Sequence, residues 1–407
     1  MYCAILSQLA PLCLCVNFSI LLLQAIFWRL LELMGLGRKR SNVGSSMDKS
    51  VCKNGGRSGG SGKTAVILLN MGGPTDISGV EGFLRRIFAD PLILRIKNSF
   101  VRKMVGSLII NKRLESVKQN YMQIGGCSPL PAHTFALCQQ LSKLDSSKIF
   151  TYAMRYTPPF ARDVLQDLQA KGVQDIVLFS MYPQFSTTTT QSSLLDIYEN
   201  LKALSYAPRV SVIDEYHAHT PLYELIADTI IHTLEHAKSA QDLSSPAPHS
   251  HRNPADFTLL LSAHSLPQKI VDSGDPYARQ CEKGVEILTE VLESRGVHFA
   301  NIELAYQSKV GPMRWLNPFT SDVISHAGGK RLIVYPLAFT IDNSETDYEL
   351  NIQYRELAAE SGVLEYLVCP CLNASEGFAR MICALVESKL ASLDSVPSAP
   401  EVPKPTD

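Results

Sequence analysis

The sequence has little net charge and few cysteines, and both shortages narrow what the protein can be. Its 38 Lys and Arg residues balance 39 Asp and Glu residues, for a net charge of −1. Without a basic field, we expect no nucleic-acid partner. Ten cysteines in 407 residues are too few for a disulfide scaffold. Apolar residues make up 45% and charged residues 19%, which is typical of a globular enzyme of two to three domains and excludes disordered, collagenous and coiled-coil chains.

Charge is absent from the first 28 residues, and Arg29 is the first charged side chain. Within this stretch, residues 10–28 are long enough to cross a bilayer, although Pro11, Asn17 and Gln24 interrupt the apolar run. Basic residues follow the run, which favours a membrane anchor with the body on the cytoplasmic side over a secretory signal. A poorly ordered extension is nevertheless the first interpretation of this stretch, a membrane anchor is the second and a targeting peptide is the third.

Residues 54–62 are rich in Gly and Ser, which is typical of a flexible linker. The residues Gly62-Lys63-Thr64 match the last three positions of a phosphate-binding P-loop motif. That motif needs a glycine where Arg57 stands, and it needs a strand before it, whereas the predicted strand comes after it. We therefore predict that residues 1–63 form an apolar and then Gly/Ser-rich N-terminal extension, without a nucleotide site.

Short apolar runs alternate with helical patterns through the rest of the chain. Such runs are typical of parallel strands that are buried on both faces of a sheet. Eight of them predict strands, at residues 65–70, 149–154, 175–182, 210–215, 257–263, 302–307, 331–337 and 364–368. Helical spacing between them, as in residues 161–171 and 277–295, predicts an α/β fold. Four strands followed by four more indicate two similar Rossmann-like lobes, each with a four-stranded parallel sheet flanked by helices, with a cleft between the lobes.

These patterns divide the chain into segments. We expect an N-terminal lobe over residues 64–207, a C-terminal lobe over residues 208–375 and a C-terminal helix over residues 376–391. Residues 392–407 are rich in proline and predict a disordered tail. Ligands of parallel sheets bind beyond the carboxyl ends of the strands, so the residues that follow each strand are the candidates for a site.

Three strand ends of the first lobe carry candidates. The turn Met71-Gly72-Gly73 lets the backbone approach a ligand closely, or is simply a tight turn. Arg155 and Tyr156 could pair with a carboxylate and stack on a flat ligand, or form contacts within the fold. A hydroxyl-rich run that starts at Ser186 could bind an anion, or could cap the helix that follows.

The second lobe carries titratable candidates. His264 stands at the end of a buried strand, where a neutral imidazole can accept a proton or bind a metal; a histidine satisfied within the core is the alternative. Glu345 and Glu349 would share one face of a helix and repel each other by roughly a few tenths of a kcal/mol, which a cation or a proton path would offset. A solvated helix face is the alternative. The sequence has no Gly-x-Ser-x-Gly motif and no cysteine cluster with zinc spacing.

Several short motifs, in their order and spacing, resemble the ferrochelatase family over residues 64–390. They are Leu69-Asn70-Met71-Gly72-Gly73-Pro74, Tyr182-Pro183-Gln184-Phe185-Ser186, Ser262-Ala263-His264-Ser265-Leu266-Pro267, Gly274-Asp275-Pro276-Tyr277, Tyr306-Gln307-Ser308-Lys309-Val310-Gly311-Pro312 and Glu345-Thr346-x-x-Glu349-Leu350. The resemblance implies a lyase of haem biosynthesis that inserts Fe²⁺ into protoporphyrin IX and releases two protons. The alternatives are a coproporphyrin ferrochelatase, a cobalt chelatase and, in a different class, a protein that binds haem or metal without turnover.

The resemblance also implies roles for individual residues. His264 and Glu345 would be catalytic, and His264, Glu345 and Glu349 would contact the metal. Four further residues would contact the porphyrin: Met71, Arg113, Tyr156 and Ser186. Of these, Arg113 and Ser186 would lie near its propionates.

Porphyrin and ferrous iron are therefore the expected partners, with iron as substrate and no retained cofactor. Thr187 stands where cluster-bearing family members have a cysteine, so we expect no [2Fe–2S] cluster. An apolar porphyrin predicts association with a membrane surface. We expect a bacterial protein in the cytoplasm, peripheral to or anchored at the inner membrane; the matrix side of the mitochondrial inner membrane is the alternative. The sequence indicates no particular oligomeric state.

Overall fold

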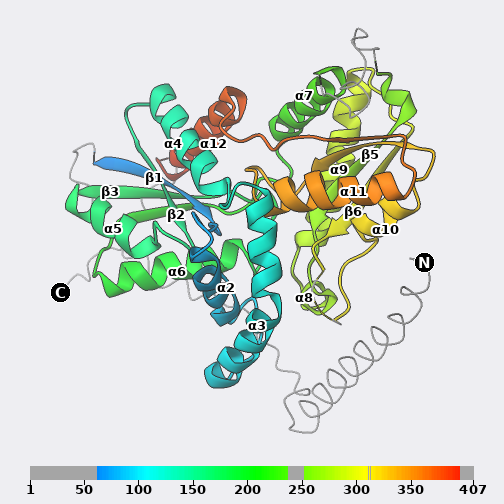
Figure 1. Cartoon of the computed structure of the whole chain (residues 1–407). Helices are drawn as coiled ribbons and strands as arrows, with labels where there is room; N and C mark the ends of the chain where they lie inside the picture. The colour runs from blue at the N-terminus through cyan, green and yellow to red at the C-terminus, as the bar shows by residue number, and fades with distance from the viewer. Residues whose placement is uncertain (1–61, 237–251, 310, 312, 395–407) are drawn as a thin grey trace, which may run out of the picture. The chain divides into compact units, whose positions relative to one another are not determined.

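The computed structural model describes residues 62–236, 252–309, 311 and 313–394. Its first sheet has four parallel strands in the spatial order β2-β1-β3-β4: β1 (Lys63–Asn70), β2 (Ile149–Met154), β3 (Val173–Ser180) and β4 (Arg209–Ile213). The second sheet repeats this order as β6-β5-β7-β8: β5 (Phe257–His264), β6 (Asn301–Gln307), β7 (Arg331–Pro336) and β8 (Glu365–Val368). All eight predicted strands are present. The expected fold of two similar α/β lobes is confirmed, and Figure 1 shows the two lobes.

The first sheet is covered on both faces because its strand residues are apolar on both sides. Alternate residues of β1, such as Ile67 and Leu69, pack against α5 (Ala161–Ala170) and α6 (Thr190–Ala203). Their neighbours, such as Val66 and Leu68, pack in a second cluster. That cluster includes side chains of two helices far apart in sequence: α4 (Leu130–Leu144) and α12 (Glu376–Asp394).

The second sheet is also covered on both faces. The side chains on one face belong to the same hydrophobic cluster as Val66 and Leu68 of the first sheet. This cluster also includes side chains of α7 (Thr220–His236) and α9 (Tyr277–Ser294). The opposite face packs against α10 (Thr320–Ser325), α11 (Tyr354–Glu360) and the π-helix η3 (Glu345–Gln353). Two short elements, η2 (Pro254–Asp256) and α8 (Gln268–Asp272), precede and follow β5.

Two of the three helices between β1 and β2 form a cluster of their own. They are α2 (Gly79–Ala89) and α3 (Ser99–Gln123). The side chain of Asn98 starts α3, because its Oδ1 accepts hydrogen bonds from the backbone N–H groups of the first turn. The packed face of α3 includes Ile110 and Tyr121. The helix therefore has one buried face and one face turned away from the core.

Two of the expected segment boundaries are wrong. A boundary between residues 207 and 208 would separate β4 from its sheet, since β4 pairs with β3 along its whole length. The last helix does not stop at residue 391, because α12 continues to Asp394. In addition, α12 packs on α4 and β4 of the first lobe, so the chain returns to its first lobe after completing the second.

Direct hydrogen bonds join the strand-end segments of the two lobes. The Thr340 hydroxyl, beyond β7, donates to the backbone oxygen of Met181, beyond β3, at 2.7 Å. The backbone N–H of Phe185 donates to Oε1 of Gln280 at 2.6 Å. The carboxyl ends of both sheets therefore meet, which places the predicted site residues of the two lobes in one region.

Across the described part of the chain, the helices are either too short or too polar to cross a membrane. The candidate span at residues 10–28, most of the predicted N-terminal extension and residues 395–407 of the predicted tail lie outside the described residues.

Candidate active site

His264 is the last residue of β5, where the strand leaves the buried sheet. Its ring is half-buried, and Nδ1 lies 2.7 Å from the backbone oxygen of Ser265. A carbonyl oxygen can only accept a hydrogen bond, so this contact requires the proton on Nδ1, and in the neutral ring the lone pair is then on Nε2. The ring of Phe339 stands edge-on to the imidazole, with ring centroids 6.5 Å apart. The site thus presents a fixed imidazole with a free basic nitrogen.

The acidic residues begin at a π-helix instead of the expected α-helix. Asn343 caps the start of η3, because its Oδ1 accepts from the backbone N–H groups of Glu345 at 2.8 Å and Thr346 at 3.3 Å. A π-helix has i→i+5 hydrogen bonds and is found often at functional sites. Within this helix the carboxylates of Glu345 and Glu349 contact different partners.

Glu345 is half-buried and is held by its neighbour. Its Oε2 accepts a hydrogen bond of 2.9 Å from the Ser344 hydroxyl. Among the described residues, no donor contacts the other carboxylate oxygen, Oε1. Glu345 therefore has one oxygen held by the protein and one available for chemistry.

Glu349 is engaged on both oxygens. Its Oε1 accepts from the backbone N–H of Ser308 at 2.9 Å and from the Tyr354 hydroxyl at 2.7 Å, and its Oε2 accepts from the Ser308 hydroxyl. Within the described ranges, no three acidic, histidine or cysteine side chains come close enough to hold a metal ion. The predicted metal contacts through His264, Glu345 and Glu349 are not assembled as a set here and stay a prediction.

Arg113 lies on α3 within electrostatic range of both glutamates. Burial lowers the pKa of Arg113, and the negative charges of Glu349 and Glu345 oppose that shift. The predicted porphyrin-contacting arginine therefore faces the acidic residues from the opposite lobe. The positive charge of Arg113 balances part of the negative charge of Glu345 and Glu349.

Met71 lies at the end of β1, in a turn that only glycine can complete. Gly72 has φ +86°, and a Cβ atom there would lie 2.1 Å from the Thr157 hydroxyl oxygen. The backbone N–H of Met71 lies within hydrogen-bond distance of Oδ1 of Asn70 and of the Tyr182 hydroxyl. The glycine motif therefore makes a tight turn that fixes Met71 at the site.

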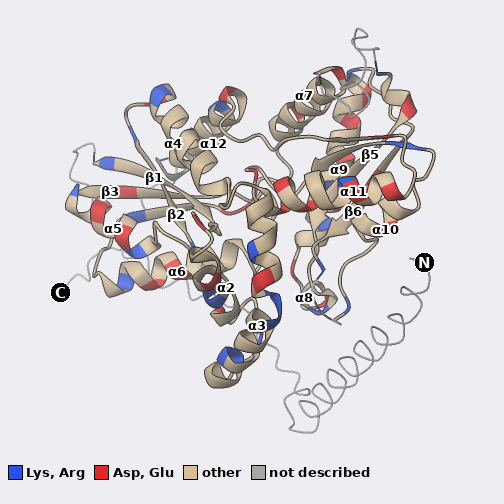
Figure 2. Cartoon of the chain, in the orientation of Figure 1, with Lys and Arg blue, Asp and Glu red and all other residues tan. Residues whose placement is uncertain are grey.

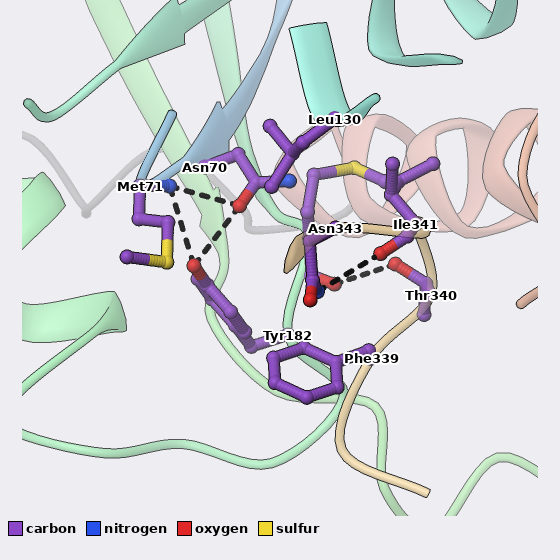
Figure 3. A pocket seen from close by; sticks show the side chains of 9 residues that line it. Asn70, Met71, Leu130, Tyr182, Phe339, Thr340, Ile341 and Asn343 are labelled. Atoms are coloured by element: carbon purple, nitrogen blue, oxygen red, sulfur yellow. Dashed lines mark hydrogen bonds between the residues drawn. The ribbon is translucent and has the colours of Figure 1, made fainter. Parts of the chain in front are cut away.

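A small cavity of about 10 Å³, with room for about one water molecule, lies where the two lobes meet (Figure 3). It is smaller than the roughly 300–1,000 Å³ of typical ligand pockets. A tetrapyrrole therefore has to lie outside it or separate the segments around it. Its lining comes from both lobes: Asn70, Met71, Leu130, Met181, Tyr182, Phe339, Thr340, Ile341 and Asn343.

Tyr156 and Ser186 are not exposed toward a ligand, in contrast to the expected porphyrin contacts. Tyr156 is 4% exposed, and its hydroxyl donates to Oδ2 of buried Asp90 at 2.9 Å. Ser186 is 1% exposed, and its hydroxyl donates to Oδ2 of Asp275 at 3.1 Å. In this structure both hydroxyls satisfy buried carboxylates and so hold the strand ends in place.

Four residues near the site were not predicted individually: Asp90, Tyr121, Asp275 and Ser344. Asp275 lies within the family motif Gly274-Asp275-Pro276-Tyr277, so this motif could have identified it as a residue of the site. Tyr121 sits at the far end of a 25-residue helix, more than 200 positions before Ser344, to which it donates a hydrogen bond. No local pattern indicates such a contact.

Taken together, the strand ends present a basic imidazole nitrogen, a carboxylate with one free oxygen, and apolar side chains around them. The imidazole and the carboxylate can each accept a proton, and the carboxylate can also replace water on a cation.

Comparison with known proteins identifies the family to which this chain is similar. The ferrochelatase family profile matches residues 63–390. The ferrochelatase of Helicobacter acinonychis (strain Sheeba) is 50% identical over 327 residues, which cover 80% of this chain and 92% of that protein. The ferrochelatase of Wolinella succinogenes is 46% identical over 324 residues, which cover 80% of this chain and 98% of that protein. Among solved structures, SirB from Bacillus subtilis with Fe³⁺ aligns with a TM-score of 0.45 and 10% identity, over 82% of this chain and 98% of that chain.

Proposed function

This chain belongs to the ferrochelatase family, and we propose that the porphyrin into which it inserts Fe²⁺ is protoporphyrin IX. Ferrochelatases are lyases of haem biosynthesis, so the enzyme class and the metal-insertion reaction follow from the family. The identity of the porphyrin and the roles of single residues are the proposed part.

Metallation breaks two pyrrole N–H bonds, forms bonds from iron to the ring nitrogens and releases two protons. The observation that carries our assignment is the free Nε2 lone pair of His264, fixed by the bond from Nδ1–H to the Ser265 carbonyl. We assign His264 as the acceptor of a pyrrole proton, since this lone pair can take up a proton by general base catalysis. We assign the free oxygen of Glu345 to the second proton or to the entering cation, where its charge offsets the loss of water.

Apolar side chains at the site support protoporphyrin over coproporphyrin. Protoporphyrin carries two vinyl groups where coproporphyrin carries two more propionates. The segments around the small cavity where the lobes meet, which a porphyrin would have to separate, carry Met71, Leu130, Phe339 and Ile341 beside polar side chains, and the lining includes no charged residue. Burying vinyl groups against such a surface is favourable, whereas burying an unpaired carboxylate is costly.

Anaerobic metallation assays test the choice of substrate. We expect the full chain with Fe²⁺ to metallate protoporphyrin IX with at least a tenfold higher kcat/KM than coproporphyrin III, measured by the change in absorbance on metallation. A preference for coproporphyrin, or for Co²⁺ over Fe²⁺, would identify a sibling chelatase. Tight porphyrin binding without any haem formation would instead favour a binding protein.

We further propose that α3 rests on a membrane surface. Phe100, Met104 and Leu108 are 75%, 47% and 56% exposed, and they lie four residues apart, so they form one stripe on the helix. Lys and Arg residues of the same helix accompany the stripe (Figure 2). Exposed apolar residues with basic neighbours are typical of helices that lie in the membrane interface.

Sedimentation with anionic phosphatidylglycerol vesicles tests this contact. Replacing Phe100, Met104 and Leu108 with serine in the full chain should weaken vesicle binding by roughly 1,000-fold or more, because each apolar side chain contributes about 1.5–3 kcal/mol when it is fully buried and about 1.4 kcal/mol is a tenfold change. Leu364→Ser is the control, since Leu364 is 55% exposed in the loop before β8. Equal binding by the triple variant and the control would place the membrane contact elsewhere.

A further inference from the structure

The hydroxyl that holds Glu345 belongs to a longer hydrogen-bonded chain. Ser344 directly precedes Glu345, and its hydroxyl donates to Oε2 of that residue at 2.9 Å. The hydroxyl of Tyr121, at the end of α3, donates in turn to the Ser344 oxygen at 3.3 Å. Both hydroxyls therefore donate in the same direction, and the chain ends on the carboxylate.

Tyr121 is placed to be a permanent donor in this chain. Its side chain is 4% exposed, so the ring cannot turn toward solvent without disturbing the cluster between α2 and α3. Burial and the negative charge of Glu345 raise the pKa of Tyr121, which keeps its hydroxyl protonated. Arg113 on the same helix also acts on Glu345 by its charge, but without a hydrogen bond.

We propose that Ser344 and Tyr121 are positioning residues for Glu345. Ser344 occupies Oε2 and so directs Oε1 toward the reacting centre, and Tyr121 fixes the orientation of the Ser344 hydroxyl. Without these donors, the carboxylate can rotate and either oxygen can turn away. Because α3 and η3 belong to different lobes, the chain also requires the two lobes to be closed against each other at this point. This inference rests on the catalytic role proposed for Glu345.

Steady-state kinetics on the full chain test the proposal. Ser344→Ala should lower kcat for iron insertion by about tenfold, as expected for the loss of a hydrogen bond to a charged group, with less than a twofold change in KM for the porphyrin. Ser344→Thr keeps the hydroxyl and should restore most of the rate. Tyr121→Phe should lower kcat by about threefold, and the double variant should be no slower than Ser344→Ala, because Tyr121 acts through Ser344.

Matched controls separate positioning from a loss of structure. Tyr206→Phe removes a hydroxyl that donates to the backbone of Val173, and Ser142→Ala removes one that donates within α4. Both should keep wild-type kcat, and all variants should unfold at similar temperatures.

The decisive comparison uses a Glu345→Gln background. There, Ser344→Ala and Tyr121→Phe should cause no further loss, since the charge on which they act is gone. Equal losses with and without Glu345, a normal rate for Ser344→Ala, or an effect on KM alone would overturn the inference. A normal rate for Glu345→Gln itself would instead overturn the proposed role of Glu345.

Discussion

Replacing His264 with alanine will lower the rate of iron insertion by about 1,000-fold, which is within the range that a positioned general base contributes. The variant removes the Nε2 lone pair that the Ser265 carbonyl holds in place. Porphyrin affinity should stay within a few fold of wild type, because the apolar lining of the site is untouched. The rate is followed by anaerobic absorbance, and affinity by the quenching of porphyrin fluorescence.

A histidine far from the site provides the control. His326 is exposed and its Nδ1 also lies next to a backbone oxygen, that of Asp322. His326→Ala should therefore metallate porphyrin at the wild-type rate. Near-normal turnover by His264→Ala would remove this imidazole from the reaction and leave the proton acceptor unassigned.

Glu345→Gln should lower kcat by about 100-fold and leave KM for the porphyrin nearly unchanged. Glutamine has the same shape and keeps an oxygen that can accept from Ser344, so the variant removes the negative charge and little else. A loss in kcat alone means that the charge acts in the transition state, whereas a rise in KM alone would mean that Glu345 positions the substrate.

An exposed glutamate nearby is the matched comparison. Glu356 lies on α11, the helix that follows η3, and is exposed. Glu356→Gln should leave both kcat and KM unchanged. If both glutamine variants lower the rate equally, the effect reflects the general charge of this region and not the position of Glu345.

Much of the fold was predictable because its strands are buried on both faces. Runs such as 257–263 are mostly apolar, with Thr258 and Ser262 as the polar exceptions, and they indicate a central parallel strand without any tertiary information. The place of His264 followed directly, since a residue after such a strand must lie at the edge of the sheet. The predictions failed where long-range contacts decide, as for β4, which pairs with the first sheet, and for α12, which packs back on it.

The candidate site was predictable to a similar depth. His264, Glu345 and Met71 lie at strand ends or follow them. Both the local sequence pattern and the family motifs predict site residues at these positions. Tyr156 and Ser186 follow strand ends as well, but their hydroxyls donate to the buried carboxylates of Asp90 and Asp275. These partners are far away in the sequence, so no local pattern predicts the contacts. The expectation that the enzyme has no [2Fe–2S] cluster stays a prediction.

The return of α12 to the first lobe has a consequence for how the protein is made. Phe378 and Ile382 of α12 complete the inner core of that lobe, and Lys148 at its edge contacts Glu387. The ribosome adds α12 roughly 180 residues after β4, which takes about 10–35 s at typical rates of synthesis. During that interval the nascent first lobe exposes an apolar face, so its final folding waits for the end of translation.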